Sequence, residues 1–269
     1  MFRPRSSLLF SAFLLPVAAE ATFSINFNFN GGLTTSQEAV FNQAKATWES
    51  YITGYKSGIT QTGITITADG SNIDGVGGVL GSAGPTSAVF QGGYWLARDG
   101  SMNFDSADPA DMESTGILDE VITHEIGHVL GIGTLWDENW NQLYINGSVQ
   151  YTGAFALDAY RDEFDPLATY VPVELGGGAD TANRHWNEND NGSGSTGITG
   201  QNGRDFTQEL MTGWIGVDSD NHYISNTTLG SLQDLGFKMF MPIPEPGLAS
   251  LTGLALVWAG FRRRRPLRG

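Results

Sequence analysis

The segment His124-Glu125-Ile126-Gly127-His128 constrains this chain more than any other. Residues four apart share one face of a helix, so both imidazoles can reach a single metal ion. Glu125 projects beside the first imidazole, where its carboxylate can take a proton from metal-bound water. The alternative is an accidental His/Glu cluster on a solvated helix, and the neighbouring residues help to decide between the two.

The residues around this motif predict a partly buried helix. Apolar side chains recur at helical spacing, at positions 118, 121, 122, 126, 129 and 130. Gly131 and Gly133 follow, as glycines do where a chain leaves a helix in a left-handed conformation. This pattern favours the metal interpretation, because a buried helix that ends in a glycine turn is a rigid platform for a site.

A catalytic zinc site normally has three protein ligands and a water. The chain has four histidines and no cysteine, so thiolate ligands are excluded and His185 and His222 are the remaining imidazoles. The compact form of the motif would place a third histidine six residues after His128, where Thr134 stands. The third ligand is therefore His185, His222 or a downstream carboxylate. The carboxylates that follow the helix include Glu138, Glu163 and Glu174.

Several segments together resemble the leishmanolysin-like zinc metallopeptidases, which are of the metzincin type. The matching segments are 124–136, His185-Trp186 and Glu209-Leu210-Met211-Thr212-Gly213, with further likeness at 81–85, 100–105 and 229–237. In that family an inserted segment displaces the third histidine from the helix, and a methionine turn forms the floor under the metal. The resemblance implies that His124, His128 and His185 bind one Zn²⁺, that Glu125 is catalytic and that Met211 is the turn methionine.

Motif order also favours His185 over His222. A floor-forming turn should follow the last ligand, and His185 precedes Met211 whereas His222 follows it. Residues 218–222 are typical of an exposed polar turn. Two departures from the family stand out: the chain lacks the disulfides of the parasite members, and residues 189–203 form a Gly/Ser/Asn-rich insertion.

The two ends of the chain carry transport signals. Residues 1–21 combine early arginines, a short apolar run and a small-x-small end, which predicts a secretory signal for signal peptidase. Residues 242–269 contain Pro244-Glu245-Pro246, an apolar run and an arginine cluster. This tail resembles the PEP-CTERM signals that exosortase-like enzymes process, which implies transient membrane contact and export to the surface of a Gram-negative bacterium. A plain membrane anchor is the alternative.

The body between these ends is strongly acidic. The tails hold two of the 29 acidic and seven of the 14 basic residues, which leaves 27 and 7, a net charge of −20 for residues 22–243. Such a body repels nucleic acid and anionic lipid. Aspartates could hold calcium together with backbone carbonyls, but the sequence has no calcium-binding motif.

Residues 22–241 are expected to form one α+β domain with a zincin/metzincin-like fold. A capping-box pattern from Thr35 to Glu38 predicts a helix to about Ile52, and strand patterns follow at 62–68, 89–91, 94–97 and 101–104. The expected architecture is an N-terminal twisted sheet with the active-site helix, then a loop-rich C-terminal subdomain with a helix near 229–235.

These features together predict a secreted or surface-sorted zinc endopeptidase that hydrolyses polypeptides, with Glu125 as general base. An extended substrate would pair with the edge strand before the helix. Two alternatives stay open: a non-catalytic surface or biofilm-matrix protein with the same fold, and a zinc amidohydrolase acting on a non-protein amide. The intact Glu125 favours catalysis, because a structural zinc site needs no base.

Overall fold

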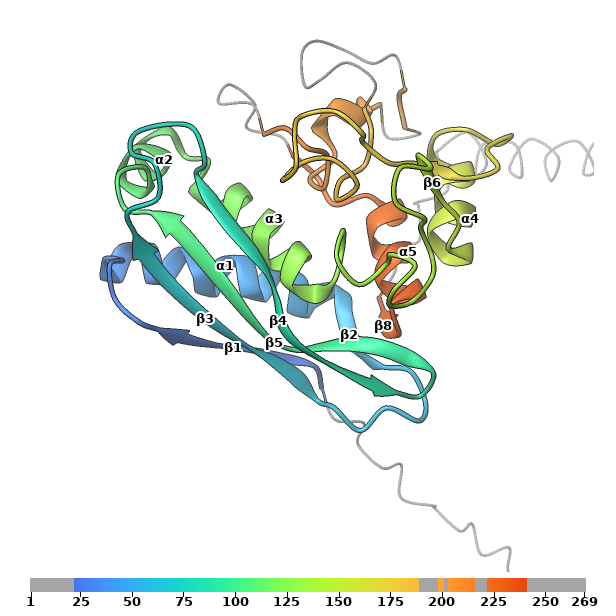
Figure 1. Ribbon diagram of the computed structural model, residues 1–269, viewed down its shortest axis with the longest axis horizontal. Helices are drawn as coiled ribbons and strands as arrows, with labels where there is room; N and C mark the ends of the chain where they lie inside the picture. Colours follow the sequence, from blue (N-terminus) through green and yellow to red (C-terminus); the bar gives the residue numbers. More distant parts are fainter. Residues whose placement is uncertain (1–21, 189–197, 201–202, 216–221, 241–269) are drawn as a thin grey trace, which may run out of the picture. The chain divides into compact units, whose positions relative to one another are not determined.

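A four-stranded mixed sheet with the order β1-β3-β5-β4 supports the N-terminal half of the protein in the computed structural model (Figure 1). The strands β1, β3 and β5 run parallel, and β4 pairs antiparallel with β5 at one edge. Their bounds are Ser24–Phe29 for β1, Gly63–Ser71 for β3, Gly81–Gln91 for β4 and Tyr94–Asp105 for β5. The three short strand patterns after residue 88 thus belong to one long hairpin.

The structure describes residues 22–188, 198–200, 203–215 and 222–240. The expected signal peptide and the whole of the expected sorting tail lie outside these residues, as does most of the Gly/Ser/Asn-rich insertion. Within the described part of the chain, no helix is long and apolar enough to span a membrane.

Helices α1 (Thr35–Tyr51) and α3 (Leu118–Leu130) pack side by side against the sheet (Figure 1). The predicted capping box is wrong by one residue: Thr34 and Gln37 form it, each side chain accepting a hydrogen bond from the other's backbone N–H. Local spacing alone could not separate Thr34 from Thr35, because both precede a polar residue at the required distance. The buried Trp48 joins the helices by donating its indole N–H to the Thr123 carbonyl at 2.8 Å.

Helix α3 can approach the sheet closely because Gly100 of β5 carries no side chain. A Cβ atom at Gly100 would stand 2.3 Å from Cγ1 of Val129. A short helix, α2 (Pro109–Thr115), precedes α3 and ends at the left-handed Gly116. The apolar stripe predicted from the sequence is buried along the whole of α3, which fixes the helix that carries the histidine motif.

The C-terminal half consists mainly of loops, as expected, with short elements among them. These are β8 (Phe237–Met239), which pairs with β2 (Ile52–Tyr55) of the N-terminal half, β6 (Gln150–Tyr151) paired with β7 (Val171–Pro172), the 3-10 turn η1 (Phe206–Gln208), and helices α4 (Ala154–Glu163) and α5 (Asn226–Asp234). Helix α5 confirms the helix expected near 229–235.

Helix α4 was not predicted, and its N-terminus explains why. No side chain of its own first turn caps it. The carboxylate of Asp234 caps it instead, accepting hydrogen bonds at 3.0 Å from the backbone N–H groups of Phe155 and Ala156. A cap supplied from about eighty residues away leaves no local start signal in the sequence.

Candidate metal centre

Helix α3 presents His124 and His128 on one buried face, one turn apart. The helix ends at Gly131, whose φ of 115° lies in the left-handed region expected from the sequence. This turn places the Ile132 carbonyl 3.0 Å from Nδ1 of His128. The glycine turn therefore both ends the helix and orients the second imidazole.

His185 reaches the same place from a distant segment that is held on both sides by backbone hydrogen bonds. The His185 carbonyl accepts from the N–H of Glu174 at 2.9 Å, and the N–H of Trp186 donates to the Met211 carbonyl at 2.9 Å. Trp186 is fully buried against the ring of Trp136, with ring centroids 4.9 Å apart. The neighbours of His185 thus hold the ligand-bearing segment in place.

The three imidazoles converge on one point. Nε2 of His128 lies 2.9 Å from that of His124 and 3.0 Å from that of His185, and the remaining pair is 3.2 Å apart. All three residues are buried. In the part of the chain that the structure describes, this is the group of His, Asp or Glu side chains placed to hold a metal ion.

The other ring nitrogens identify which tautomer each imidazole adopts. Nδ1 of His124 lies 2.6 Å from the Leu210 carbonyl, and Nδ1 of His185 lies 2.8 Å from the Thr181 carbonyl. A carbonyl oxygen only accepts hydrogen bonds, so each Nδ1 carries the proton and donates it. The Nε2 atoms of the neutral rings are then bare, and three lone pairs face one another with no proton between them.

Burial favours this neutral form. It lowers the pKa of each of the three rings to about 3, and the nearness of the other rings adds to the effect. Neutral imidazole is the form that binds a metal. The rings are therefore ready to act as ligands at neutral pH without first losing a proton.

The donor set fits zinc. Nitrogen ligands around a tetrahedral zinc, at about 2.0–2.1 Å from the ion, stand roughly 3.3 Å from one another. The observed separations of the Nε2 atoms are only slightly shorter. Each ring also donates its Nδ1–H to a backbone carbonyl, the arrangement that usually orients metal-binding histidines. A buried His124–His128–His185 group that could bind a metal ion is thus present.

Glu125 lies on α3 directly beside His124 and keeps part of its surface exposed. Burial of its carboxyl raises the pKa of Glu125 to about 7. A carboxyl group with a pKa near neutrality, on the residue that follows His124, is suited to exchange protons in either direction.

Met211 packs against the middle of the motif. A Cβ atom at Gly127 would stand 2.6 Å from the sulfur of Met211, so the thioether lies against the helix turn between the two histidines. Met211 is fully buried. Met211 therefore lies beside the histidine turn, and its role as a turn methionine stays a prediction.

His222 lies outside the cluster, and the expectation of an exposed turn is wrong for its side chain, which is 2% exposed. Its Nδ1 lies 2.6 Å from Oε2 of Glu120 at the start of α3. It lines a pocket of about 270 Å³ whose other walls include Tyr51, Asp119 and Arg204. The remainder of the turn, residues 218–221, lies outside the described residues.

The three candidate carboxylate ligands bind backbone N–H groups instead of joining the histidines. Glu138 accepts from Asn146, Glu174 from Gly176, and Glu163 from Asn226 and Thr227. Each of these contacts holds a loop or a helix end. The structure therefore brings together the three histidines expected from the sequence and places the alternatives elsewhere.

The sequence matches no protein-family model, and a search of curated proteins finds no similar sequence. The function of the chain must therefore be inferred from its own site.

Proposed function

We propose that this protein is a zinc-dependent endopeptidase with a zincin-type fold. The observation that carries the proposal is the convergence of three bare Nε2 atoms, two of them from the helix that also carries Glu125. His124, His128 and His185 would hold the metal, which when bound lowers the pKa of water and polarises a carbonyl group. A purely structural zinc site would need no carboxylate at position 125.

Proton transfer and metal binding are carried out by different residues of the chain. Glu125 accepts the proton of the attacking water and passes it to the leaving amine, so that the same carboxyl acts first as base and then as acid. The buried imidazoles keep their Nδ1 protons throughout, because each is bonded to a backbone carbonyl. They therefore serve as fixed ligands and leave proton transfer to Glu125.

The edge strand β4 suggests how a polypeptide would be bound. It is the outermost strand of the sheet on the side of α3, with which it is in contact. An edge strand has unpaired backbone N–H and C=O groups that an extended peptide can pair with. A substrate added to β4 would run along the helix that carries His124 and Glu125. This supports a peptide substrate over a small amide.

The proposal is tested by gel zymography on casein with the purified protein. We expect cleavage by the wild type, loss of cleavage with a chelator and recovery on adding Zn²⁺. Glu125→Ala should bind one zinc ion yet be inactive, whereas Glu113→Ala, an exposed glutamate on α2, should cleave normally. Cleavage that persists in Glu125→Ala would refute the mechanism. Zinc binding without cleavage in the wild type would favour a matrix protein or an amidohydrolase.

A further inference from the structure

Glu209 is a fully buried carboxylate that accepts four hydrogen bonds. Oε1 accepts from the backbone N–H and the hydroxyl of Ser225 at 3.1 and 2.9 Å, and from the hydroxyl of Thr228 at 2.5 Å. Oε2 accepts from the N–H of Met211 at 2.6 Å. Burying a charged group is costly unless hydrogen-bond donors surround it. These four donors therefore make a carboxylate possible at this buried position.

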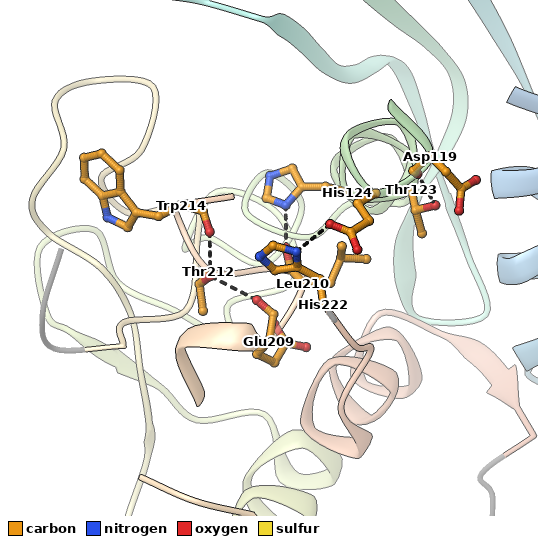
Figure 2. Close-up of polar contacts among 9 residues, drawn as sticks. Asp119, Thr123, His124, Glu209, Leu210, Thr212, Trp214 and His222 are labelled. Carbon is orange, nitrogen blue, oxygen red and sulfur yellow. Dashed lines mark hydrogen bonds and ion pairs between the residues drawn. The ribbon is translucent and has the colours of Figure 1, made fainter. Parts of the chain in front are cut away.

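The N–H of Met211 belongs to the same peptide group as the carbonyl of Leu210. That carbonyl oxygen accepts a hydrogen bond from the Nδ1–H of His124, with 2.6 Å between the oxygen and Nδ1 (Figure 2). One peptide plane therefore lies between the Glu209 carboxylate and the His124 imidazole, with a short hydrogen bond at each end. Hydrogen bonds in such a chain polarise one another, because electron density drawn toward the peptide oxygen strengthens it as an acceptor.

A second branch from Glu209 leads toward His185. The hydroxyl of Thr228, which donates to Glu209, also accepts from the indole N–H of Trp186 at 2.9 Å. Trp186 directly follows His185 in the sequence. Glu209 is thus hydrogen-bonded to the Leu210–Met211 peptide, whose carbonyl accepts a hydrogen bond from His124. Through Thr228 it is also linked to Trp186, the residue that follows His185.

We propose that Glu209 is a positioning residue which, through the Leu210–Met211 peptide, orients the His124 ring and strengthens it as a metal ligand. This inference rests on the proposed zinc site. Metal-binding histidines often donate to a carboxylate directly, which raises their basicity as ligands. Here the carboxylate acts through an intervening peptide group, so its effect reaches His124 without contact between the two side chains.

Glu163 offers a matched control. Glu163 is partly buried and, like Glu209, accepts hydrogen bonds at the start of α5, from the N–H groups of Asn226 and Thr227 at 2.9 Å and from the Thr227 hydroxyl at 3.1 Å. None of these partners belongs to the Leu210–Met211 peptide. Replacing Glu163 by glutamine therefore disturbs the same helix end while leaving the chain from Glu209 to His124 intact.

The test compares Glu209→Gln with Glu163→Gln in the full-length protein at about pH 8.5. Burial raises the pKa of Glu209 to about 7, so the carboxylate is ionised there. The first measurement is the proton NMR shift of each Nδ1–H in the metal-free protein. We expect the His124 signal to move upfield in Glu209→Gln, because its acceptor weakens. The His128 signal, whose acceptor is the Ile132 carbonyl outside this network, serves as the internal reference.

The second measurement is the dissociation constant for Zn²⁺ by competition with a chromophoric chelator. We expect it to rise roughly tenfold or more in Glu209→Gln and to stay unchanged in Glu163→Gln. Equal effects of the two variants, or an unchanged His124 signal, would overturn the inference. If the wild type binds no zinc while the His124 signal still moves, the proposed function fails and the hydrogen-bond chain stands.

Thr228→Val provides a second route should Glu209→Gln fold poorly. It keeps the size of the side chain but removes the hydroxyl that links Trp186 to Glu209. We expect a smaller rise in the zinc dissociation constant than in Glu209→Gln, together with a change in the His124 signal. A zinc affinity and a His124 signal both equal to those of the wild type would contradict the positioning role.

Discussion

The backbone of Gly133 lies directly against the carbonyl group of Arg184. A Cβ atom at Gly133 would stand 2.3 Å from that oxygen, and its φ of 77° lies in the left-handed region. Arg184 directly precedes His185. The turn after the histidine helix and the segment that supplies the third histidine therefore meet at a position that only glycine can occupy.

This contact predicts that Gly133→Ala disrupts the metal centre. A left-handed conformation costs a non-glycine residue about 1–2 kcal/mol, and here the backbone of Arg184 must also move away, taking His185 with it. We expect zinc affinity to fall at least about tenfold. The control is Gly147→Ala, because Gly147 has a φ of 79° with nothing within 4 Å of its Cβ position. Gly147→Ala should lower the stability of the protein without changing its zinc affinity. Equal zinc affinity in the two variants would contradict the prediction.

The identity of the third ligand gives a second prediction. His185→Ala removes one of three converging Nε2 atoms, so the protein should retain no zinc after gel filtration. His222→Ala removes a ring that bonds to Glu120, and zinc content should remain near one ion per chain. Metal analysis of the two purified variants distinguishes them. Full zinc content in His185→Ala would exclude the tri-histidine site.

The first two ligands of the site could be read directly from local sequence. His124 and His128 lie one helical turn apart, and an apolar stripe with a closing glycine fixes where their helix is buried. His185 could be chosen only from the family resemblance and from motif order, because the hydrogen bonds from Glu174 and to Met211 that place its segment are long-range. Periodicity contains no information about such contacts.

The same distinction applies to the fold. The helix at 35–51 and the strands of the sheet have local patterns, whereas α4 is capped from Asp234 and could not be seen in sequence. Backbone carbonyls that orient the histidines, such as those of Leu210 and Thr181, were missed for a related reason. Any residue type has a carbonyl group, so only three-dimensional structure can show that these oxygens belong to the site.

The packing of Met211 against Gly127 predicts that the effect of Gly127→Ala on the free energy of unfolding changes when Met211 is also replaced. Gly127→Ala alone should destabilise the protein by about 1–3 kcal/mol, because the new methyl group would overlap the buried thioether. In a Met211→Ala background that overlap is gone, and the same change should be neutral or stabilise by up to about 1 kcal/mol, since alanine favours helix. Denaturant unfolding gives the free energy of unfolding of the wild type, the two single variants and the double variant. Additive effects would show that the two residues do not interact.

The pH dependence of catalysis should report the ionisation of Glu125. Burial raises its pKa to about 7, and a cation held by the histidines would lower it. As pH falls through the resulting value, the carboxylate becomes protonated and cannot accept a proton from water. We therefore expect kcat/KM to fall about tenfold per pH unit below a midpoint under 7. The histidines have pKa values of about 3, so zinc content measured in the same buffers should stay constant down to about pH 5. If kcat/KM instead falls together with the zinc content as pH is lowered, the pH dependence belongs to the histidine ligands. That result would contradict the role of Glu125 as base.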